Sequence, residues 1–290
     1  MVNIIQSLAI RGAPLIGIGA ALCLAKYIHD GACDKEIAYA SKQLSTARPT
    51  AINLNFAVSK VYSNYLKYGA QKAIKTAYEL FDNDANSCEK IASHGSQLIK
   101  ANSRVLTYCN TGSLATAGIG TALGIITTAH QQENIKHVYA CETRPLLQGG
   151  RLTAWELKRQ KISFSLLCDN AAGQLMQDGK VDAVITGADR VVANGDTANK
   201  VGTSVIAVLC QYFNIPFYVA LPSSTFDFSL THGKDIQIEQ RNPEEVLKIN
   251  SQNNLEAFNP AFDITPSALI TSFVTEQGIF SPSELTKLQN

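Results

Sequence analysis

A thiol and a carboxylic acid stand at two places where an apolar strand is expected to end. Cys109 follows the run 104–108, and Asp189 follows the run 183–186; both runs are rich in β-branched and other apolar residues. In a parallel sheet the carboxyl ends of the strands share one edge, which is where ligands bind. A thiol and a carboxylic acid on opposite sides of a substrate carbon could share proton donation and abstraction.

Amide and basic side chains accompany this pair. Asn199 and Lys200 lie just ahead of an expected helix, where a lysine and free backbone amides would make a good phosphate site. Burial is expected to raise the pKa of Asp189, whereas Arg190 or Lys200 would lower it. The pattern predicts an enzyme that acts on a phosphorylated small molecule. The plain alternative for an Asp after a strand is a helix cap or a turn.

Composition narrows the class of protein. The chain has 290 residues, 46% of them hydrophobic, and a net charge of +1 without a basic block, so nucleic acid and membrane are not expected as partners. Seven cysteines without CxxC spacing argue against a disulfide framework and favour a reducing cytosol. The five histidines show no HxH or HExxH spacing, so we expect no catalytic metal and no cofactor.

The predicted secondary structure that positions these residues changes near residue 98, from helices alone to alternating strands and helices. Residues 1–98 are expected to form a mainly helical N-terminal domain, and residues 99–290 an α/β domain with a doubly wound parallel sheet. Among the expected helices are 34–44, 51–68, 70–81, 88–99, 114–129, 150–161, 171–177 and 203–213. The expected strands are 104–108, 137–141, 163–167, 183–186 and 216–221.

Several longer motifs resemble the methylthioribose-1-phosphate isomerase family over essentially the whole chain. They are Ala9-Ile10-Arg11-Gly12-Ala13-Pro14, Arg48-Pro49-Thr50-Ala51-Ile52-Asn53-Leu54, Cys109-Asn110-Thr111-Gly112, Glu142-Thr143-Arg144-Pro145, Gln148-Gly149-Gly150-Arg151-Leu152-Thr153, Gly187-Ala188-Asp189-Arg190, Asn194-Gly195-Asp196, Asn199-Lys200-Val201-Gly202-Thr203, Pro222-Ser223-Ser224-Thr225-Phe226-Asp227, Ile238-Glu239-Gln240-Arg241 and Asn259-Pro260-Ala261-Phe262-Asp263-Ile264-Thr265-Pro266.

The resemblance implies a small helical lobe, a Rossmann-like domain with a homodimer, and a cytoplasmic aldose–ketose isomerase of methionine salvage. It assigns the catalytic thiol to Cys109 and the catalytic acid to Asp189. The positions that it implies for substrate binding are Arg11, Gly12, Ala13, Arg48, Gln148, Asn199 and Lys200. Hydrogen transfer between C2 and C1 of the sugar can follow a proton route through Cys109 or a direct hydride shift, and both stay open.

The resemblance leaves two alternative functions open, and the chain departs from the family pattern in one respect. A sister isomerase would act on 5-deoxyribose 1-phosphate or ribose 1,5-bisphosphate, and a regulatory subunit of the translation-initiation nucleotide-exchange factor would share the fold without needing the Cys109–Asp189 pair. Family members usually carry several tens of residues ahead of the loop at Arg11. We therefore expect this chain to lack the family's first elements, which help to cover the substrate.

Overall fold

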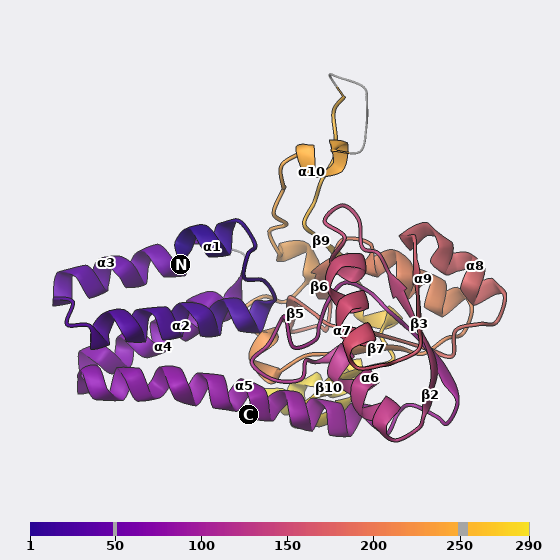
Figure 1. Cartoon of the computed structure of the whole chain (residues 1–290), viewed down its shortest axis with the longest axis horizontal. Coiled ribbons are helices and arrows are strands. Elements are labelled where there is room, and N and C mark those ends of the chain that lie inside the picture. The colour runs from indigo at the N-terminus through magenta and orange to yellow at the C-terminus, as the bar shows by residue number, and fades with distance from the viewer. Residues whose placement is uncertain (49–50, 249–254, 290) are drawn as a thin grey trace.

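The computed structural model describes residues 1–48, 51–248 and 255–289. Pro49 and Thr50, which belong to one of the motifs above, lie outside the described residues. Figure 1 shows two parts side by side, a group of helices from the N-terminal third and a mixed sheet domain, with an arm that carries α10 (Glu244–Leu247) projecting from the sheet domain.

The N-terminal part is helical, as the sequence predicts. Its helices are α1 (Val2–Gln6), α2 (Ala13–His29), α3 (Asp34–Ser45), α4 (Ile52–Tyr68) and α5 (Ala70–Ser96). Helices α2 and α4 cross closely at Gly17, because a Cβ there would lie only 2.5 Å from the carbonyl oxygen of Asn53. The two helices expected at 70–81 and 88–99 are one continuous helix, since residues 82–87 contain neither Gly nor Pro to interrupt it.

A seven-stranded sheet forms the centre of the second part, in the order β11-β10-β7-β4-β1-β2-β3. Its strands are β1 (Ser103–Thr107), β2 (Ile135–Cys141), β3 (Phe164–Leu167), β4 (Ala183–Thr186), β7 (Phe217–Ala220), β10 (Ser272–Thr275) and β11 (Gly278–Phe280). All neighbouring pairs are parallel except β10 with β11. The strand order reverses between β1 and β4, which is where open sheets of this kind bind ligands.

Helices cover both faces of the sheet, which confirms the predicted doubly wound α/β architecture. Helices α5, α6 (Ala122–Gln131) and α7 (Ala154–Arg159) share one buried cluster with Val105 and Ile185. Helices α8 (Ala172–Gln177) and α9 (Thr203–Tyr212) share another with Leu106 and Val184. Successive residues along β1 and β4 point to opposite faces of the sheet. Val105 and Ile185 therefore belong to one cluster, and Leu106 and Val184 to the other.

The helix expected at 114–129 begins only at residue 122, so its first part was predicted wrongly. Gly120 has a φ of 98°, and its backbone pairs with Gly112 in an isolated bridge. A Cβ at Gly120 would lie 2.4 Å from the Gly112 Cα, so only glycine fits there. The loop 112–121 therefore folds back on the end of β1 before the helix starts.

A second, four-stranded sheet was not expected from the sequence. It has the order β8-β5-β6-β9 and consists of β5 (Arg190–Val192), β6 (Thr197–Lys200), β8 (Phe226–Asp227) and β9 (Phe262–Thr265). Strands of two to four residues with polar members, such as Thr-Ala-Asn-Lys, lack the alternation that marks a strand. This sheet places Asn199 and Lys200 on a strand.

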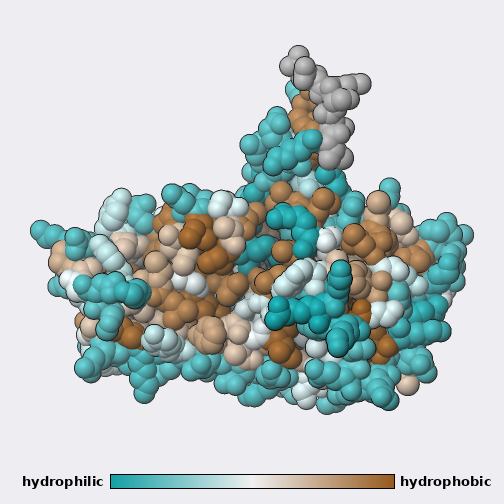
Figure 2. Space-filling model, in the orientation of Figure 1, coloured by the Kyte–Doolittle hydropathy of each residue, from teal (hydrophilic) through white to brown (hydrophobic). Residues whose placement is uncertain are grey.

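Hydrophobic and hydrophilic residues are unevenly spread over the surface. Figure 2 shows brown residues gathered over the helical part, whereas the arm and the far end of the sheet domain are mostly teal. Among the described helices, none combines the length and the apolar character needed to cross a bilayer.

Candidate active site

A cavity lies where α2 begins, against the carboxyl ends of β1 and β4. It measures about 680 Å³, including space that opens to solvent. All nine site residues named from the sequence line it: Arg11, Gly12, Ala13, Arg48, Cys109, Gln148, Asp189, Asn199 and Lys200. The structure thus brings together residues from both parts of the chain, while their individual roles stay predictions.

Cys109 has a backbone conformation that fixes the direction of its thiol. It follows β1 with a φ of 65°, in the left-handed region that non-glycine residues seldom adopt. Thr143 Oγ1 accepts the Cys109 N–H over 2.9 Å, and Thr153 Oγ1 donates to the Cys109 carbonyl over 2.6 Å. The side chain is 7% exposed and lines the cavity. These bonds offset a backbone strain of about 1–3 kcal/mol.

Arg11 reaches from the loop before α2 to the end of β1. Its Nη1 donates to Asn110 Oδ1 over 2.8 Å, and its Nη2 lies 3.6 Å from Cys109 Sγ. Gly12, with a φ of 90°, lets this loop press against the chain at Ala115, where a Cβ would lie 2.5 Å from the carbonyl oxygen. The loop therefore brings a guanidinium group next to the thiol.

Asp189 stands at the end of β4 and faces the cavity. Burial raises the pKa of its carboxyl group, and the charges of Lys200, Arg48 and Arg11 act in the opposite direction without cancelling the effect. A raised pKa suits a general acid. Arg190, the other basic neighbour suggested by the sequence, forms an ion pair with Asp227 at 3.6 Å.

Lys200 is 8% exposed and lies on β6. Its Nζ donates to the Ala261 carbonyl over 2.9 Å and lies 4.8 Å from the centre of the Phe262 ring. Burial lowers the pKa of Lys200, while Cys109 and Asp189 raise it. A cation so little solvated gains strongly from an anionic ligand.

The start of α9 is not the free anion site that the sequence suggested. Asp263 accepts the N–H of Gly202 over 2.7 Å and the N–H of Ser204 over 3.2 Å. The Ser204 hydroxyl donates to the same carboxylate over 2.7 Å. The protein therefore caps this helix with its own carboxylate, and a bound anion is left to the cationic side chains.

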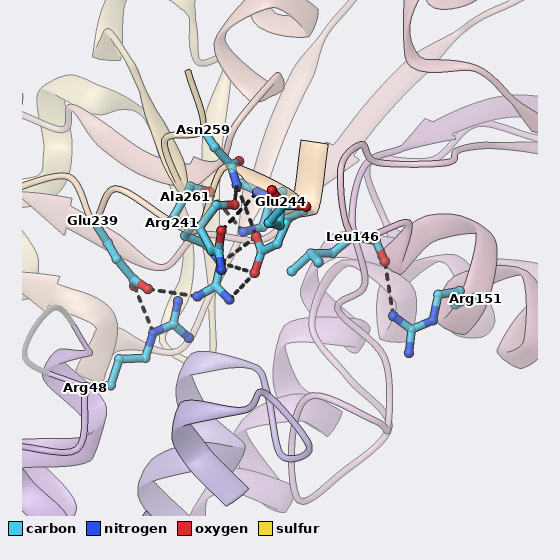
Figure 3. Close-up of polar contacts among 11 residues, drawn as sticks. Arg48, Leu146, Arg151, Glu239, Arg241, Glu244, Asn259 and Ala261 are labelled. Carbon is cyan, nitrogen blue, oxygen red and sulfur yellow. Dashed lines mark hydrogen bonds and ion pairs between the residues drawn. The ribbon is translucent and has the colours of Figure 1, made fainter. Parts of the chain in front are cut away.

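Arg48 lies between an aromatic ring and a carboxylate. Its guanidinium carbon is 5.5 Å from the centre of the Phe262 ring, and its Nε donates to Glu239 Oε2 over 3.2 Å. Figure 3 shows Arg48 and Arg241 both directed at Glu239. Phe262 thus contacts both Arg48 and Lys200, and it holds the two cations at one end of the cavity.

Gln148 contributes a buried oxygen without a partner. The side chain is 5% exposed, and its Oε1 accepts no hydrogen bond within the described part of the chain. Leaving such an atom unsatisfied costs about 1–3 kcal/mol. A ligand hydroxyl that donates to Oε1 would remove this cost, so Gln148 fits a substrate-binding role.

Sequence reasoning missed several members of the site. Phe262 and the apolar wall residues were not singled out, and the wall consists of Leu8, Ala115, Ala188, Ala220, Leu221 and Pro222. Glu156, a buried carboxylate behind Asn110, was missed as well. Its one sequence signal is an acidic residue inside the apolar pattern of a helix. Within the described ranges, no three His, Cys, Asp or Glu residues are grouped so that they could hold a metal ion.

Comparison with known proteins places this site in a family. The chain belongs to the initiation factor 2 subunit family, whose sequence model matches residues 9–282. Within that family it is similar to methylthioribose-1-phosphate isomerases. The isomerase of Yersinia enterocolitica is 47% identical over 98% of this chain and 85% of its own length. That of Serratia proteamaculans is 45% identical over 99% of this chain and 86% of its own length. These matches confirm the resemblance inferred from the motifs.

Solved structures support the same relationship. The 5-methylthioribose 1-phosphate isomerase of Pyrococcus horikoshii superposes with a TM-score of 0.91 at 37% identity, over 99% of this chain and 86% of its own. A structure described as translation initiation factor eIF-2B, subunit delta, from A. fulgidus superposes with a TM-score of 0.85 at 38% identity, over 99% of this chain and 89% of its own. The fold is therefore common to proteins that carry both kinds of name.

Proposed function

We propose that this protein converts 5-methylthioribose 1-phosphate to 5-methylthioribulose 1-phosphate, an aldose–ketose isomerisation in methionine salvage. The observation that carries the proposal is the joint placement of Asp189, Cys109 and three cations in one cavity. The isomerases that match the chain over nearly its whole length bear the name of this activity.

Asp189 is proposed as the acid that opens the sugar ring. The anomeric oxygen of the substrate carries the phosphate, so the ring does not open as a free hemiacetal would. Protonation of the ring oxygen lets the bond from that oxygen to C1 break. The raised pKa of Asp189 keeps a proton available for this step.

Hydrogen must then move from C2 to C1 while the C2 hydroxyl becomes a carbonyl. On the proton route, Cys109 removes the proton from C2 and returns it to C1 of the resulting enol, while the C2 hydroxyl gives its proton to the Asp189 carboxylate and becomes the carbonyl. On the hydride route, hydrogen moves with its electron pair from C2 to C1 as the hydroxyl loses its proton. Substrate labelled with deuterium at C2 helps to separate the two: loss of label to solvent shows a proton route, and retention of label together with near-normal turnover in Cys109→Ala assigns the direct shift.

Arg11, Arg48 and Lys200 are proposed to hold the phosphate, which stays on the product. All three charges act on Asp189, so they form a single basic cluster. One part of the remaining wall is apolar, with Leu221 and Pro222 among its members, while Thr111, Thr116 and Thr121 line another part. An apolar wall favours a methylthio or deoxy group at C5 over a second phosphate.

A turnover assay tests the substrate. The purified chain is offered 5-methylthioribose 1-phosphate, 5-deoxyribose 1-phosphate and ribose 1,5-bisphosphate, and the ketose product is measured. Preference for the first supports the proposal, and preference for either of the others replaces its substrate. Absence of turnover with all three would favour a role as a translation-initiation-factor subunit, which is the name that the A. fulgidus structure carries. Asp189→Asn serves as the inactive control.

We also propose a homodimer in the cytoplasm. The family resemblance supports the dimer, and sedimentation equilibrium of the purified chain tests it. All seven cysteines are free in the structure, which supports a reducing compartment. The division into domains at residue 98 stays a prediction, and limited proteolysis near that position would test it.

A further inference from the structure

Glu156 is a buried carboxylate directly behind the wall of the cavity. It belongs to α7 and is 2% exposed. Its Oε1 accepts from Asn110 Nδ2 over 2.7 Å, and its Oε2 accepts from the Ser113 N–H and the Ser113 hydroxyl, each over 2.7 Å. Glu156 is not among the residues that line the cavity, so it does not touch the substrate.

Asn110 Nδ2 donates to Glu156 Oε1 over 2.7 Å and to Thr153 Oγ1 over 3.3 Å, and these two acceptors set which way the Asn110 amide faces. An ionised carboxylate only accepts hydrogen bonds, so the NH₂ of Asn110 must point toward Glu156 and the amide oxygen must point away. That oxygen, Oδ1, accepts Arg11 Nη1 over 2.8 Å. Arg11 Nη2 in turn lies 3.6 Å from Cys109 Sγ. One line of contacts, called the relay below, therefore runs from Glu156 through Asn110 and Arg11 to the Cys109 thiol.

The backbone around Glu156 is shaped to admit this carboxylate. A Cβ at Gly112 would lie 2.3 Å from Glu156 Oε2, so residue 112 has to be glycine for the carboxylate to sit against the loop. The same loop contains Ser113, whose N–H and hydroxyl bind Oε2. A buried charge held by several donors and by a fitted backbone is costly to build, which is characteristic of residues that position a functional site.

We propose that Glu156 is a positioning residue for the Arg11–Cys109 pair: it orients the Asn110 amide, which holds the Arg11 guanidinium beside the thiol. The inference extends the proposed isomerase function, since Arg11 and Cys109 act on the substrate there. Its central claim, however, concerns the state of the thiol in the free protein. That claim can be measured without turnover.

Two variants separate the relay from the packing of the loop. In Glu156→Gln the side chain keeps its shape but has one acceptor oxygen and one NH₂ where three donors converge, so the hydrogen bond that orients the Asn110 amide is weakened. In Ser113→Ala the hydroxyl bond to the same carboxylate is removed while the Asn110 bond stays. We expect kcat/KM to fall about 10- to 100-fold in Glu156→Gln. We expect a change below about twofold in Ser113→Ala.

The first readout is the rate at which iodoacetamide alkylates Cys109 at a fixed pH, followed by mass spectrometry of its peptide. Arg11 Nη2 lies 3.6 Å from Cys109 Sγ in the wild-type protein. Losing this cationic donor changes the reactivity of the sulfur, so we expect the rate in Glu156→Gln to change by about threefold or more. Lys200 and Tyr108 also interact electrostatically with Cys109, and neither is altered in these variants. An unchanged alkylation rate in folded Glu156→Gln overturns the proposal.

The second readout is a double-mutant cycle with Arg11→Ala. If Glu156 acts through Arg11, adding Glu156→Gln to Arg11→Ala lowers kcat/KM and alkylation little further. Fully additive losses would show that the two residues act separately and would also overturn the proposal.

A third variant, Asn110→Ser, covers the case in which Glu156→Gln does not fold. It removes the link and leaves Glu156 bonded to Ser113, so it should give the same shift in alkylation of Cys109. No shift in Asn110→Ser counts against the relay. A protein that shows the alkylation shifts but turns over none of the three sugars would retain the relay and lose only the isomerase assignment.

Discussion

Arg48 and Glu239 are 191 positions apart in the chain, yet their side chains form an ion pair with Nε 3.2 Å from Oε2. Glu239 also accepts from Arg241 Nη1 over 2.8 Å, and Arg241 continues to Glu245 (Figure 3). A cationic residue of the cavity is thus held by the base of the projecting arm. The position of Arg48 depends on a segment far from the helical part to which it belongs.

Replacing Glu239 by Gln removes the charge that holds Arg48. We expect KM for the sugar phosphate to rise about 3- to 10-fold while kcat changes less, since the loss concerns binding more than the chemical step. Steady-state kinetics measures the split. Glu244→Gln, an exposed residue of the same arm, is the matched control and should leave both constants unchanged. Equal effects of the two variants would show that the ion pair does not support the site.

The same variant makes a prediction on pH. The charge of Glu239 raises the pKa of Asp189, so its removal lowers that pKa. Activity that requires protonated Asp189 falls as pH rises through this pKa, and in Glu239→Gln the fall should begin at a lower pH. The pH profile of kcat checks the direction, and a shift to higher pH would contradict the proposed role of Asp189 as an acid.

Phe262 contacts two cations at once, so its ring should matter for phosphate binding. Phe262→Leu keeps an apolar side chain but removes the aromatic face beneath Arg48 and Lys200. Two cation–π contacts of about 0.5–1 kcal/mol each predict a rise in KM of roughly 5- to 30-fold. Phe258→Leu, on an exposed aromatic residue nearby in sequence, is the control. The dissociation constant for inorganic phosphate, measured by calorimetry, should rise in parallel with KM.

Asp189→Asn should lower kcat by about 10²- to 10⁴-fold and leave the fold intact. Its stability should also depend on pH in a defined direction. The folded-state pKa of Asp189 is raised above its unfolded value of about 3.9, so its stabilising contribution is complete below that pH and is lost as pH rises through the folded pKa. Asn lacks this titration. The Tm of the variant relative to wild type should therefore be more favourable near pH 8 than near pH 5 in scanning calorimetry. The reverse trend would contradict a raised pKa.

Cys109→Ala tests the thiol. We expect a strong loss of kcat, about 10²-fold or more, with little change in Tm, because the bonds that hold the backbone come from Thr143 and Thr153. Cys168→Ala is the control, since that thiol is exposed and lies outside the cavity. Near-normal turnover in Cys109→Ala would assign hydrogen transfer to the hydride route.

Much of this fold follows from hydrophobic pattern. The strands that end at Cys109 and Asp189 were predicted because buried parallel strands are short, continuous and apolar. The start of α6 was not, because residues 113–121 were grouped with the Ala- and Leu-rich segment that follows them, although Gly118 and Gly120 weaken a helix there. The bridge between Gly120 and Gly112 forms only in the folded protein. The second sheet was not predicted for a similar reason, because its strands pair with partners that are distant in sequence.

Nine of the cavity residues were predictable because polar residues at strand ends and long motifs both pointed to them. Their interactions were not. That Asp263 closes the start of α9, that Phe262 lies beside two cations, and that Glu156 supports Asn110 all depend on segments brought together only by folding. No local spacing in the sequence records such contacts.

The cavity takes Arg11 and Arg48 from the helical part and its thiol, acid and lysine from the sheet domain. The helical part carries two of the three cations proposed to hold the phosphate, and the sheet domain carries the third together with the groups that would move hydrogen. Two polypeptides made by cutting the chain between them would each be inert, and turnover would return only on reassembly. Fragment complementation would then report directly on how well the two surfaces recognise each other.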